Sequence, residues 1–536
     1  MLVVAILICA AVRLYLIDQA VIAADGTIYL EMARKWTANP MEVIKGYDYP
    51  PGYPVATVGV HRFLVALGLT DRRELWEYSG RIVSLVSNLA ALVAIWIFAG
   101  SVLDWRIATI AVLLFGVGKK WAHLGANVLS DSLAICFQLW AVVLLLKCLA
   151  LLRRKSRWAL LVAGCVGILA GLGYLARPES LWVAVIAATV WLGRSVIRRA
   201  NVSLTLASIA VMCAAVLAVA GPYMRSIGGL SNKGSVNKIL KQTQDGRVPA
   251  AAVATATASL TPSTCIGLVD IWTGSTLQKM GGQFSEAMHP ILGILCFVWV
   301  AGLAVKLLLR GKTVDLPLPI PNNAGKAIMV AAAAIILPIL AMLHLESGYL
   351  SHRHISFLAA LLSPLAVAGI MFLAGMLTLA FKSRGAPANR ALWVTPVIVG
   401  AVFVGLSYHT LHCPHRDKAH IRQAGLYISG MAGSEDVLLT DDARMGYYAG
   451  ITYRLFDPKS VTATKFREML EKEEPAATLV AFSEKELLQA TGHDPALAGL
   501  FQGSRSAKLG EFLKTGANDD KIVVYRVSQL TSMSGR

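Results

Sequence analysis

Long apolar segments recur along residues 1–408 of the chain, separated by shorter polar connections. Several approach the roughly 20 residues that an α-helix needs to cross the hydrocarbon core of a bilayer. The segments lie at residues 2–22, 82–102, 107–117, 132–152, 160–175, 181–192, 204–221, 290–309, 327–345, 355–379 and 392–408. The pattern predicts an α-helical polytopic membrane protein with about eleven transmembrane helices, of which 107–117 is short enough to be half-inserted. Segment 2–22 lacks a charged start, so we expect a retained helix, with a signal peptide as the alternative.

The pattern changes after residue 408, where long apolar runs give way to short ones and acidic residues increase. Residues 436–440, 477–482 and 522–525 are typical of strands, and 444–448 and 465–472 are typical of helices. The sequence therefore predicts two domains. Residues 1–408 form the membrane domain, with a first extracytoplasmic loop at 23–80 and a long loop at 222–289, and residues 409–536 form a small α/β domain. The small domain contains no glycine-rich phosphate loop, so nothing in it indicates nucleotide binding.

Composition excludes a single soluble domain. The 536 residues are 56% hydrophobic and have a mean hydropathy of +0.60. The net charge of +18 falls mainly in alternate short connections, as the positive-inside rule requires of cytoplasmic loops. These basic residues are Arg106, Lys147, Arg153, Arg154, Lys155, Arg157, Arg194, Arg198, Arg199, Arg310, Lys312, Lys382, Arg384 and Arg390. Topology thus explains the charge without a nucleic-acid partner, and it predicts a cytoplasmic N-terminus and an extracytoplasmic 409–536 domain.

The same topology gathers polar residues on the extracytoplasmic side. They are Asp25, Lys119, Lys120, His123, Asp131, Arg177, Glu179, His352, Arg353 and His354. Carboxylates can act as general bases or bind a divalent metal such as Mg or Mn, and Arg and Lys can hold a phosphate. A site for a phosphorylated lipid needs both kinds of group, so we expect the chemistry on this side of the membrane.

Each of these residues also has a structural explanation. Asp25 could cap the helix that starts at Gly26, and Asp131 could cap the helix that starts at Ser132. Lys119 and Lys120 could be interface anchors, and residues 177–179 could be a structural turn in which Pro178 starts the next helix. His352 and His354 could bind a metal. We favour phosphate contact by Arg353, because residues two apart on a helix point in different directions.

Six of the eight cysteines lie in apolar runs and are typical of packing residues. Cys265 and Cys413 both fall in segments predicted to be extracytoplasmic, which leaves a disulfide between them open.

The order of short motifs resembles that of a known family. The motifs are residues 25–30 (DGTIYL), 49–54 (YPPGYP), 130–131 (SD), 176–179 (ARPE) and 351–354 (SHRH). Together they resemble the bacterial GT-C glycosyltransferases of the family 39/83 group, which includes protein O-mannosyltransferases and the aminoarabinose and lipopolysaccharide-core sugar transferases. The resemblance covers about residues 1–408. Gly26 departs from the family, because many members carry a second acidic residue there.

The resemblance implies a polyprenyl-phosphate sugar as donor and inversion at the anomeric carbon. Asp25 would be the general base, Asp131 would assist the acceptor or a metal, and Arg353 would neutralise the leaving phosphate. The further substrate-binding candidates are Tyr29, Tyr49, Tyr53, Lys119, Lys120, Arg177, Glu179 and His352. The acceptor would be a lipid, a glycan or a protein at the outer side of a bacterial inner membrane.

We therefore predict an integral-membrane glycosyltransferase. A transferase of another phospholipid-borne group would use the same cations. A transporter or flippase for a polyprenyl-linked sugar is the main alternative, but the sequence shows no convincing internal repeat of the kind transporters carry. A non-catalytic scaffold that binds through its C-terminal domain is a third alternative, which activity retained without residues 409–536 would exclude.

Overall fold

The computed structural model describes residues 1–197, 201–232, 274–308, 317–347, 350–383, 388–412, 418–457, 461–471, 476–485, 508–514 and 521–527. The chain divides into two compact units. The first comprises residues 1–15 and 32–412, and the second comprises residues 16–31 and 413–536. The second unit thus takes in a short N-terminal segment that the predicted 409–536 domain did not include.

The first unit is helical throughout its described part. Its helices are α1 (Leu2–Gln19), which begins here, the end of α2 (Ala24–Trp36), α3 (Pro40–Gly46), α4 (Gly52–Ala66), α5 (Arg73–Val102), α6 (Trp105–Val117), α7 (Lys119–Ala126), α8 (Ser130–Arg153), α9 (Trp158–Ala176), η1 (Pro178–Leu181), α10 (Trp182–Ile197), α11 (Val202–Ile227), α15 (Gly274–Met288), α16 (Pro290–Leu308), α17 (Asn323–Ser347), α18 (His352–Ser383) and α19 (Ala388–Leu411). Ten helices of the described part are long and apolar enough to cross a membrane, and the pair α6 and α7 would raise the number to eleven. The predicted polytopic helical fold is confirmed.

The short segment predicted at 107–117 corresponds to a bent pair of helices. Gly118 has an extended backbone (φ −60°, ψ 135°) between α6 and α7. An extended residue interrupts the helical hydrogen-bond ladder, and the two helices diverge by 70°. The bend brings Lys119 and Lys120 to the start of α7.

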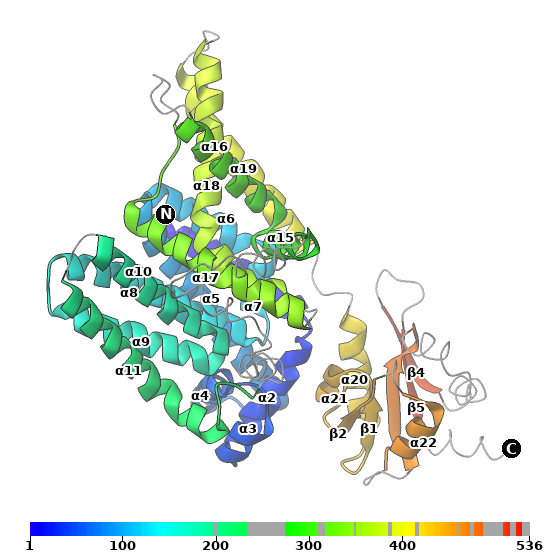
Figure 1. Ribbon diagram of the computed structural model, residues 1–536. Coiled ribbons are helices and arrows are strands. Elements are labelled where there is room, and N and C mark those ends of the chain that lie inside the picture. The colour runs from blue at the N-terminus through cyan, green and yellow to red at the C-terminus, as the bar shows by residue number, and fades with distance from the viewer. Residues whose placement is uncertain are drawn as a thin grey trace. The chain divides into compact units, whose positions relative to one another are not determined.

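Small residues let the long helices approach closely. In α9, a Cβ on Gly167 would overlap the Met212 carbonyl oxygen of α11, and one on Gly171 would lie 2.8 Å from Val219 Cβ. Such close backbone approach is how helices associate in a membrane, where no hydrophobic force drives them together. Figure 1 shows α9 and α11 side by side along their length.

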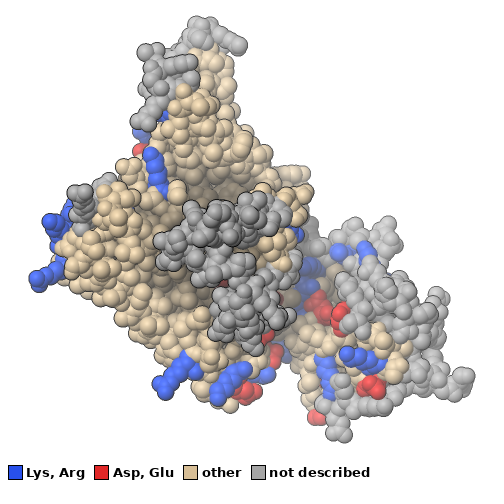
Figure 2. Space-filling model, viewed as in Figure 1, with Lys and Arg blue, Asp and Glu red and all other residues tan. Residues whose placement is uncertain are grey.

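The surface of the helical unit is largely apolar. In the view of Figure 2 most of its described surface carries neither acidic nor basic side chains. Large apolar side chains such as Leu14, Leu161, Leu217, Phe297 and Val404 are exposed there. A surface of this kind suits contact with lipid.

The second unit contains a five-stranded sheet in the order β2-β1-β3-β5-β4. The strands are β1 (Val437–Thr440), β2 (Thr452–Leu455), β3 (Leu479–Ser483), β4 (Lys508–Leu513) and β5 (Lys521–Arg526). β2 and β3 flank β1 in parallel, whereas β5 pairs antiparallel with both β3 and β4.

Helices cover both faces of this sheet (Figure 1). The helices of the second unit are α20 (Ala419–Met431), α21 (Ala443–Ala449) and α22 (Ala463–Glu471). Leu438 and Leu479 pack with Ile428 of α20, whereas the next residues along the strands, Leu439 and Val480, pack with Phe466 of α22. Alternate strand residues point to opposite faces, so each face has its own apolar core.

Some predicted features fall outside the described residues. Cys265 and Cys413 both do, so their pairing stays a prediction. The predicted loop 222–289 begins within α11, which runs to Ile227, and ends with α15.

Candidate functional site

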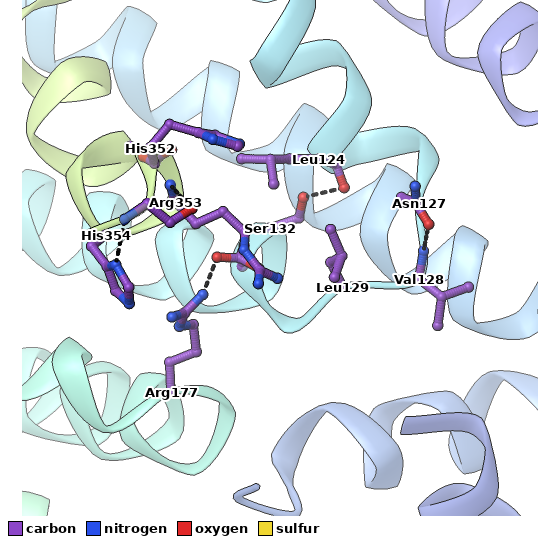
Figure 3. A network of polar contacts seen from close by, with 12 residues as sticks. Leu124, Asn127, Val128, Leu129, Ser132, Arg177, His352, Arg353 and His354 are labelled. Atoms are coloured by element: carbon purple, nitrogen blue, oxygen red, sulfur yellow. Dashed lines mark hydrogen bonds and ion pairs between the residues drawn. The ribbon is translucent and has the colours of Figure 1, made fainter. Parts of the chain in front are cut away.

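Asp131 lies at the centre of a buried polar group that three segments bring together. It stands in the first turn of α8, and its side chain is only 2% exposed. Arg177, between α9 and η1, forms an ion pair with Oδ1 of Asp131, and Nη1 of Arg353 lies 3.7 Å from Oδ2. Figure 3 shows Arg177 and Arg353 reaching toward the start of α8 from opposite sides.

Glu179 and His354 complete this group. A guanidinium nitrogen of Arg177 lies 3.3 Å from Glu179 Oε1, and Nε2 of His354 lies 4.0 Å from the same oxygen. We call Asp131, Arg177, Glu179, Arg353 and His354 the Asp131 cluster. They line a recess of about 20 Å³ together with residues that include Gln138 and Phe357. A recess of this size has room for about one water molecule, so a sugar would require side chains to move.

The YPPGYP motif packs against the backbone immediately before Arg177. A Cβ on Gly52 would lie 2.5 Å from the carbonyl oxygen of Leu175 and 2.9 Å from the nitrogen of Ala176. Only glycine lets α4 begin this close to the last turn of α9. Pro178 then starts η1, because its fixed φ suits the first helical position. The local sequence thus fixes the backbone on both sides of Arg177.

A second group of charges lies at the start of α7 and α18. Nζ of Lys120 is 2.5 Å from Oε1 of Glu286, and Nδ1 of His352 is 3.7 Å from the same oxygen. Burial raises the pKa of Glu286, but the hydrogen bond and charge of Lys120 and the nearby His352 outweigh it, so the pKa falls below its usual value. We call Lys120, Glu286 and His352 the Glu286 group; its side chains are 23–38% exposed.

Lys119 faces a pair of histidines. The rings of His289 and His409 meet edge to face at 5.1 Å. Burial first, and then the charges of His409 and Lys119, lower the pKa of His289 to about 4. His289 is therefore neutral at neutral pH and adds no charge beside Lys119.

The predicted tyrosines differ in exposure. Tyr53 is fully buried, and its hydroxyl donates to the Gly80 carbonyl oxygen at 2.8 Å and lies 2.9 Å from Ser84 Oγ. Tyr29 is 5% exposed and Tyr49 is half-buried. Tyr53 and Tyr29 therefore present little surface to a substrate, and the substrate contact proposed for them stays a prediction.

Asp25 occupies the first turn of α2 and is partly exposed. Asp25 and Tyr29 belong to the second unit, whereas the Asp131 cluster and the Glu286 group belong to the first.

The surroundings of Asp131 do not suit a divalent metal. Cationic side chains face both of its carboxylate oxygens. Across the described ranges, no group of three His, Cys, Asp or Glu side chains could hold a metal ion. A metal ion would have to displace the guanidinium of Arg177 from Asp131 and gain further ligands, so the proposed mechanism contains no step through a metal.

The sequence did not predict Glu286 as a site residue, because Glu286 lies inside the predicted loop 222–289. The available signal was a carboxylate four residues before Pro290, close to the start of an apolar run. The sequence also did not predict the pairing of Asp131 with Arg177, which are 46 residues apart.

No protein-family model matches the chain, and no curated protein matches it in sequence. Solved structures do match in fold. ArnT from Cupriavidus metallidurans in the apo state matches with a TM-score of 0.56 and 14% identity, over 98% of both chains. The same protein bound to undecaprenyl phosphate gives 0.54 and 12%, over 97% of both. The oligosaccharyltransferase AglB from Archaeoglobus fulgidus, in complex with an inhibitory peptide and a dolichol-phosphate, gives 0.53 and 11%, over 99% of this chain and 77% of that one.

The chain therefore shares its fold with ArnT and with the archaeal oligosaccharyltransferase AglB, which agrees with the polytopic helical fold expected from the sequence. At identities this low the likeness establishes the fold alone, and the activity has to be argued from the site.

Proposed function

We propose that the chain is an integral-membrane glycosyltransferase that moves a sugar from a polyprenyl-phosphate donor to a lipid, glycan or protein acceptor. The observation that carries the proposal is the gathering of three cations, Lys120, Arg177 and Arg353, around buried Asp131 and half-exposed Glu286, with the imidazole of His352 beside Glu286. In a GT-C fold, such a group of cations suits the phosphate of a lipid-linked donor. Two structures of this fold contain undecaprenyl phosphate and dolichol-phosphate, which supports this class of donor.

Arg353 and Lys120 are the proposed phosphate ligands. Their side chains are 25% and 30% exposed. Arg353 meets Asp131 at 3.7 Å, which is beyond hydrogen-bond distance, so this pair is a charge contact that a phosphate oxygen could replace. His352 belongs to the Glu286 group and is also close enough to Arg353 of the Asp131 cluster to be affected by its charge.

The proposed reaction is a single displacement. The acceptor hydroxyl attacks the anomeric carbon of the donor, and a general base takes the hydroxyl proton, a role that the resemblance of the DGTIYL motif assigns to Asp25. The bond between the anomeric carbon and the phosphate oxygen breaks, and the polyprenyl phosphate leaves with the electron pair. Arg353 and Lys120 stabilise the negative charge that grows on the leaving phosphate. Attack opposite the leaving group inverts the anomeric carbon.

The proposed location is a bacterial inner membrane, with the reaction on the extracytoplasmic side. The alternation of basic connections supports a cytoplasmic N-terminus and an extracytoplasmic C-terminal domain. A divalent metal such as Mg or Mn at Asp131 is not part of the proposed mechanism.

The test is turnover of a synthetic polyprenyl-phosphate sugar by the purified protein in detergent. We expect the wild type to consume the donor. Asp25→Asn should bind the donor with nearly unchanged affinity but lose kcat by about 10²- to 10⁴-fold, because it lacks the general base. Arg353→Gln should raise the KM for the donor and also lower kcat, because the phosphate gains charge during the reaction.

Asp104→Asn is the matched control. Asp104 is the N-cap of α6, where its side chain accepts a hydrogen bond from the Arg106 backbone, so it is an acid that only stabilises the start of a helix. If Asp25→Asn behaves like Asp104→Asn, Asp25 only stabilises the first turn of α2 and another carboxylate is the base. If no donor in a panel is consumed while the donor crosses liposomes that contain the protein, the transferase proposal is wrong and a flippase takes its place.

A further inference from the structure

A lone arginine is buried in the first transmembrane helix. Arg13 lies in α1 and has no exposed surface. It forms no ion pair with an acidic side chain anywhere in the described part of the chain. An arginine at the centre of a membrane helix costs about 2.5–3.5 kcal/mol on insertion scales, so such residues mark sites where the charge is used.

The guanidinium of Arg13 bonds three separate acceptors. Nε donates to Oδ1 of Asn88 in α5 at 2.7 Å, and Nη1 donates to the carbonyl oxygen of Cys9 at 2.6 Å. Nη2 donates to the carbonyl oxygen of Gly116 at 3.0 Å. Gly116 lies in the last turn of α6, where backbone carbonyls have no partner within the helix and carry the negative end of its dipole. Arg13 therefore stabilises the end of α6 immediately before the 70° bend.

Asn88 extends the hydrogen-bond network from α6 to the two helices that follow the bend. Its Nδ2 donates to the carbonyl oxygen of Trp121 in α7 at 3.3 Å and to Oγ of Ser132 in α8 at 3.4 Å. Oγ of Ser132 donates in turn to the carbonyl oxygen of Leu124 at 2.8 Å, as Figure 3 shows. The network thus joins α1, α5, both arms of the bend and the residue beside Asp131.

Gly125 lets α7 lie directly on this network. A Cβ there would stand 2.8 Å from Nε of Arg13 and 2.8 Å from Cγ of Asn88. Any side chain at position 125 would therefore have to displace Arg13 or Asn88.

We propose that Arg13 and Asn88 are positioning residues, which hold the bend between α6 and α7 and thereby place Lys119 and Lys120 and the start of α8 for the donor phosphate. α7 carries Lys120 of the Glu286 group, and the first turn of α8 carries Asp131, which faces Arg353. Arg13 itself does not touch these groups and acts through the backbone of α6, α7 and α8. The inference rests on the proposed function for its kinetic consequence, but the bracing of the bend is independent of it.

The experiment compares the full-length wild type with Arg13→Gln, Arg13→Lys and Asn88→Ala in detergent. Hydrogen exchange followed by mass spectrometry reports the bend through peptides that cover residues 118–131. Donor titrations of the same proteins report KM and kcat. Arg106→Gln is the matched control, because Arg106 lies in the first turn of α6, the helix that Arg13 contacts, and its side chain is exposed.

We expect faster exchange at 118–131 and a donor KM raised by about tenfold or more in Arg13→Gln and Asn88→Ala, the size of one hydrogen bond to a charged group. The acceptor KM should change little. Arg13→Lys should not restore either value, because the compact ammonium group of lysine cannot reach all three acceptors that the planar guanidinium bonds. The double variant should be no worse than the single ones, because both residues belong to one network.

Unchanged exchange at 118–131 in Arg13→Gln would overturn the inference. A variant that melts earlier but keeps the wild-type donor KM and exchange pattern would show that Arg13 only stabilises the fold, which also overturns it. If the wild type itself turns over no donor, the proposed function fails, and the exchange data still decide whether Arg13 braces the bend.

Discussion

Gly52 shows how a single missing Cβ shapes the site. Its backbone lies against Leu175 and Ala176, directly before Arg177. The turn motif that the sequence places in the first loop therefore acts by packing against the end of α9, and its two neighbouring prolines fix the entry of α4.

Gly52→Ala should destabilise the protein by about 1–3 kcal/mol, because the new methyl group would overlap backbone atoms that cannot move independently. Displacing the end of α9 also shifts Arg177, so the donor KM should rise. Thermal unfolding in detergent and donor titration measure the two effects.

Gly59→Ala is the control in the same helix. A Cβ at Gly59 meets nothing within 4 Å, so this change should leave the protein as stable as the wild type or up to about 1 kcal/mol more stable. Equal melting temperatures for the two variants would contradict the role assigned to Gly52.

At the scale of elements, α15 places a carboxylate where the proposed donor needs cations. Glu286 pairs with Lys120 and lies near His352. A bound phosphate and the Glu286 carboxylate would compete for the positive charge of Lys120, so α15 weakens donor binding until its carboxylate is displaced.

Glu286→Gln should therefore lower the donor KM by about two- to fivefold, because ion pairs of this exposure contribute up to ~1 kcal/mol. Donor titration measures this change. Glu74→Gln, at an exposed acid in the first turn of α5, is the control and should have no effect. A raised KM in Glu286→Gln would mean that Glu286 supports the donor and does not compete with it.

The same pair predicts a pH dependence. The pKa of Glu286 is below its ordinary value of 4.5 in the folded protein. Its contribution to stability is therefore fully present above about pH 5 and is lost as the pH falls through the lowered pKa. Unfolding of the wild type and Glu286→Gln should accordingly differ by a constant amount from about pH 5 to 8, and the difference should shrink below that range.

Elements differ in how well the sequence predicts them. The transmembrane helices follow from long apolar runs, and β1, β3 and β5 follow from short buried ones. β2 and β4 lie at the two edges of the sheet and carry exposed residues, so they lack a clear apolar pattern. The meeting of Asp131, Arg177 and Arg353 could be expected from the order of the apolar segments, but the pairing of Asp131 with Arg177 depends on helix packing that no local pattern encodes.

At the scale of the whole molecule, the second unit joins residues from both ends of the chain. The backbone N–H of Ile22 donates to the hydroxyl of Tyr448 at 3.3 Å, and the guanidinium of Arg422 lies over the same ring at 5.7 Å. Tyr447 and Tyr448 are 9% and 5% exposed, so they pack inside this unit and offer little surface to a sugar.

Tyr448→Phe should leave the buried N–H of Ile22 without its acceptor, at a cost of about 1–3 kcal/mol. Hydrogen exchange should then speed up at residues 16–31, which contain Asp25. Tyr427→Phe removes a hydroxyl that donates to Leu509 within the same unit and should leave residues 16–31 unchanged. Equal protection of this segment in both variants would show that the Tyr448 hydroxyl does not anchor it.

The buried arginine of α1 has a consequence for biogenesis. When α1 leaves the ribosome, the partners of Arg13 in α5 and α6 have not been made, because Asn88 and Gly116 lie 75 and 103 residues further along. Until then the charge opposes partition of α1 into lipid. Stable insertion of α1 is therefore coupled to the synthesis and packing of α5 and α6. The ribosome must translate the chain beyond Gly116 before α1 is stably inserted in the bilayer.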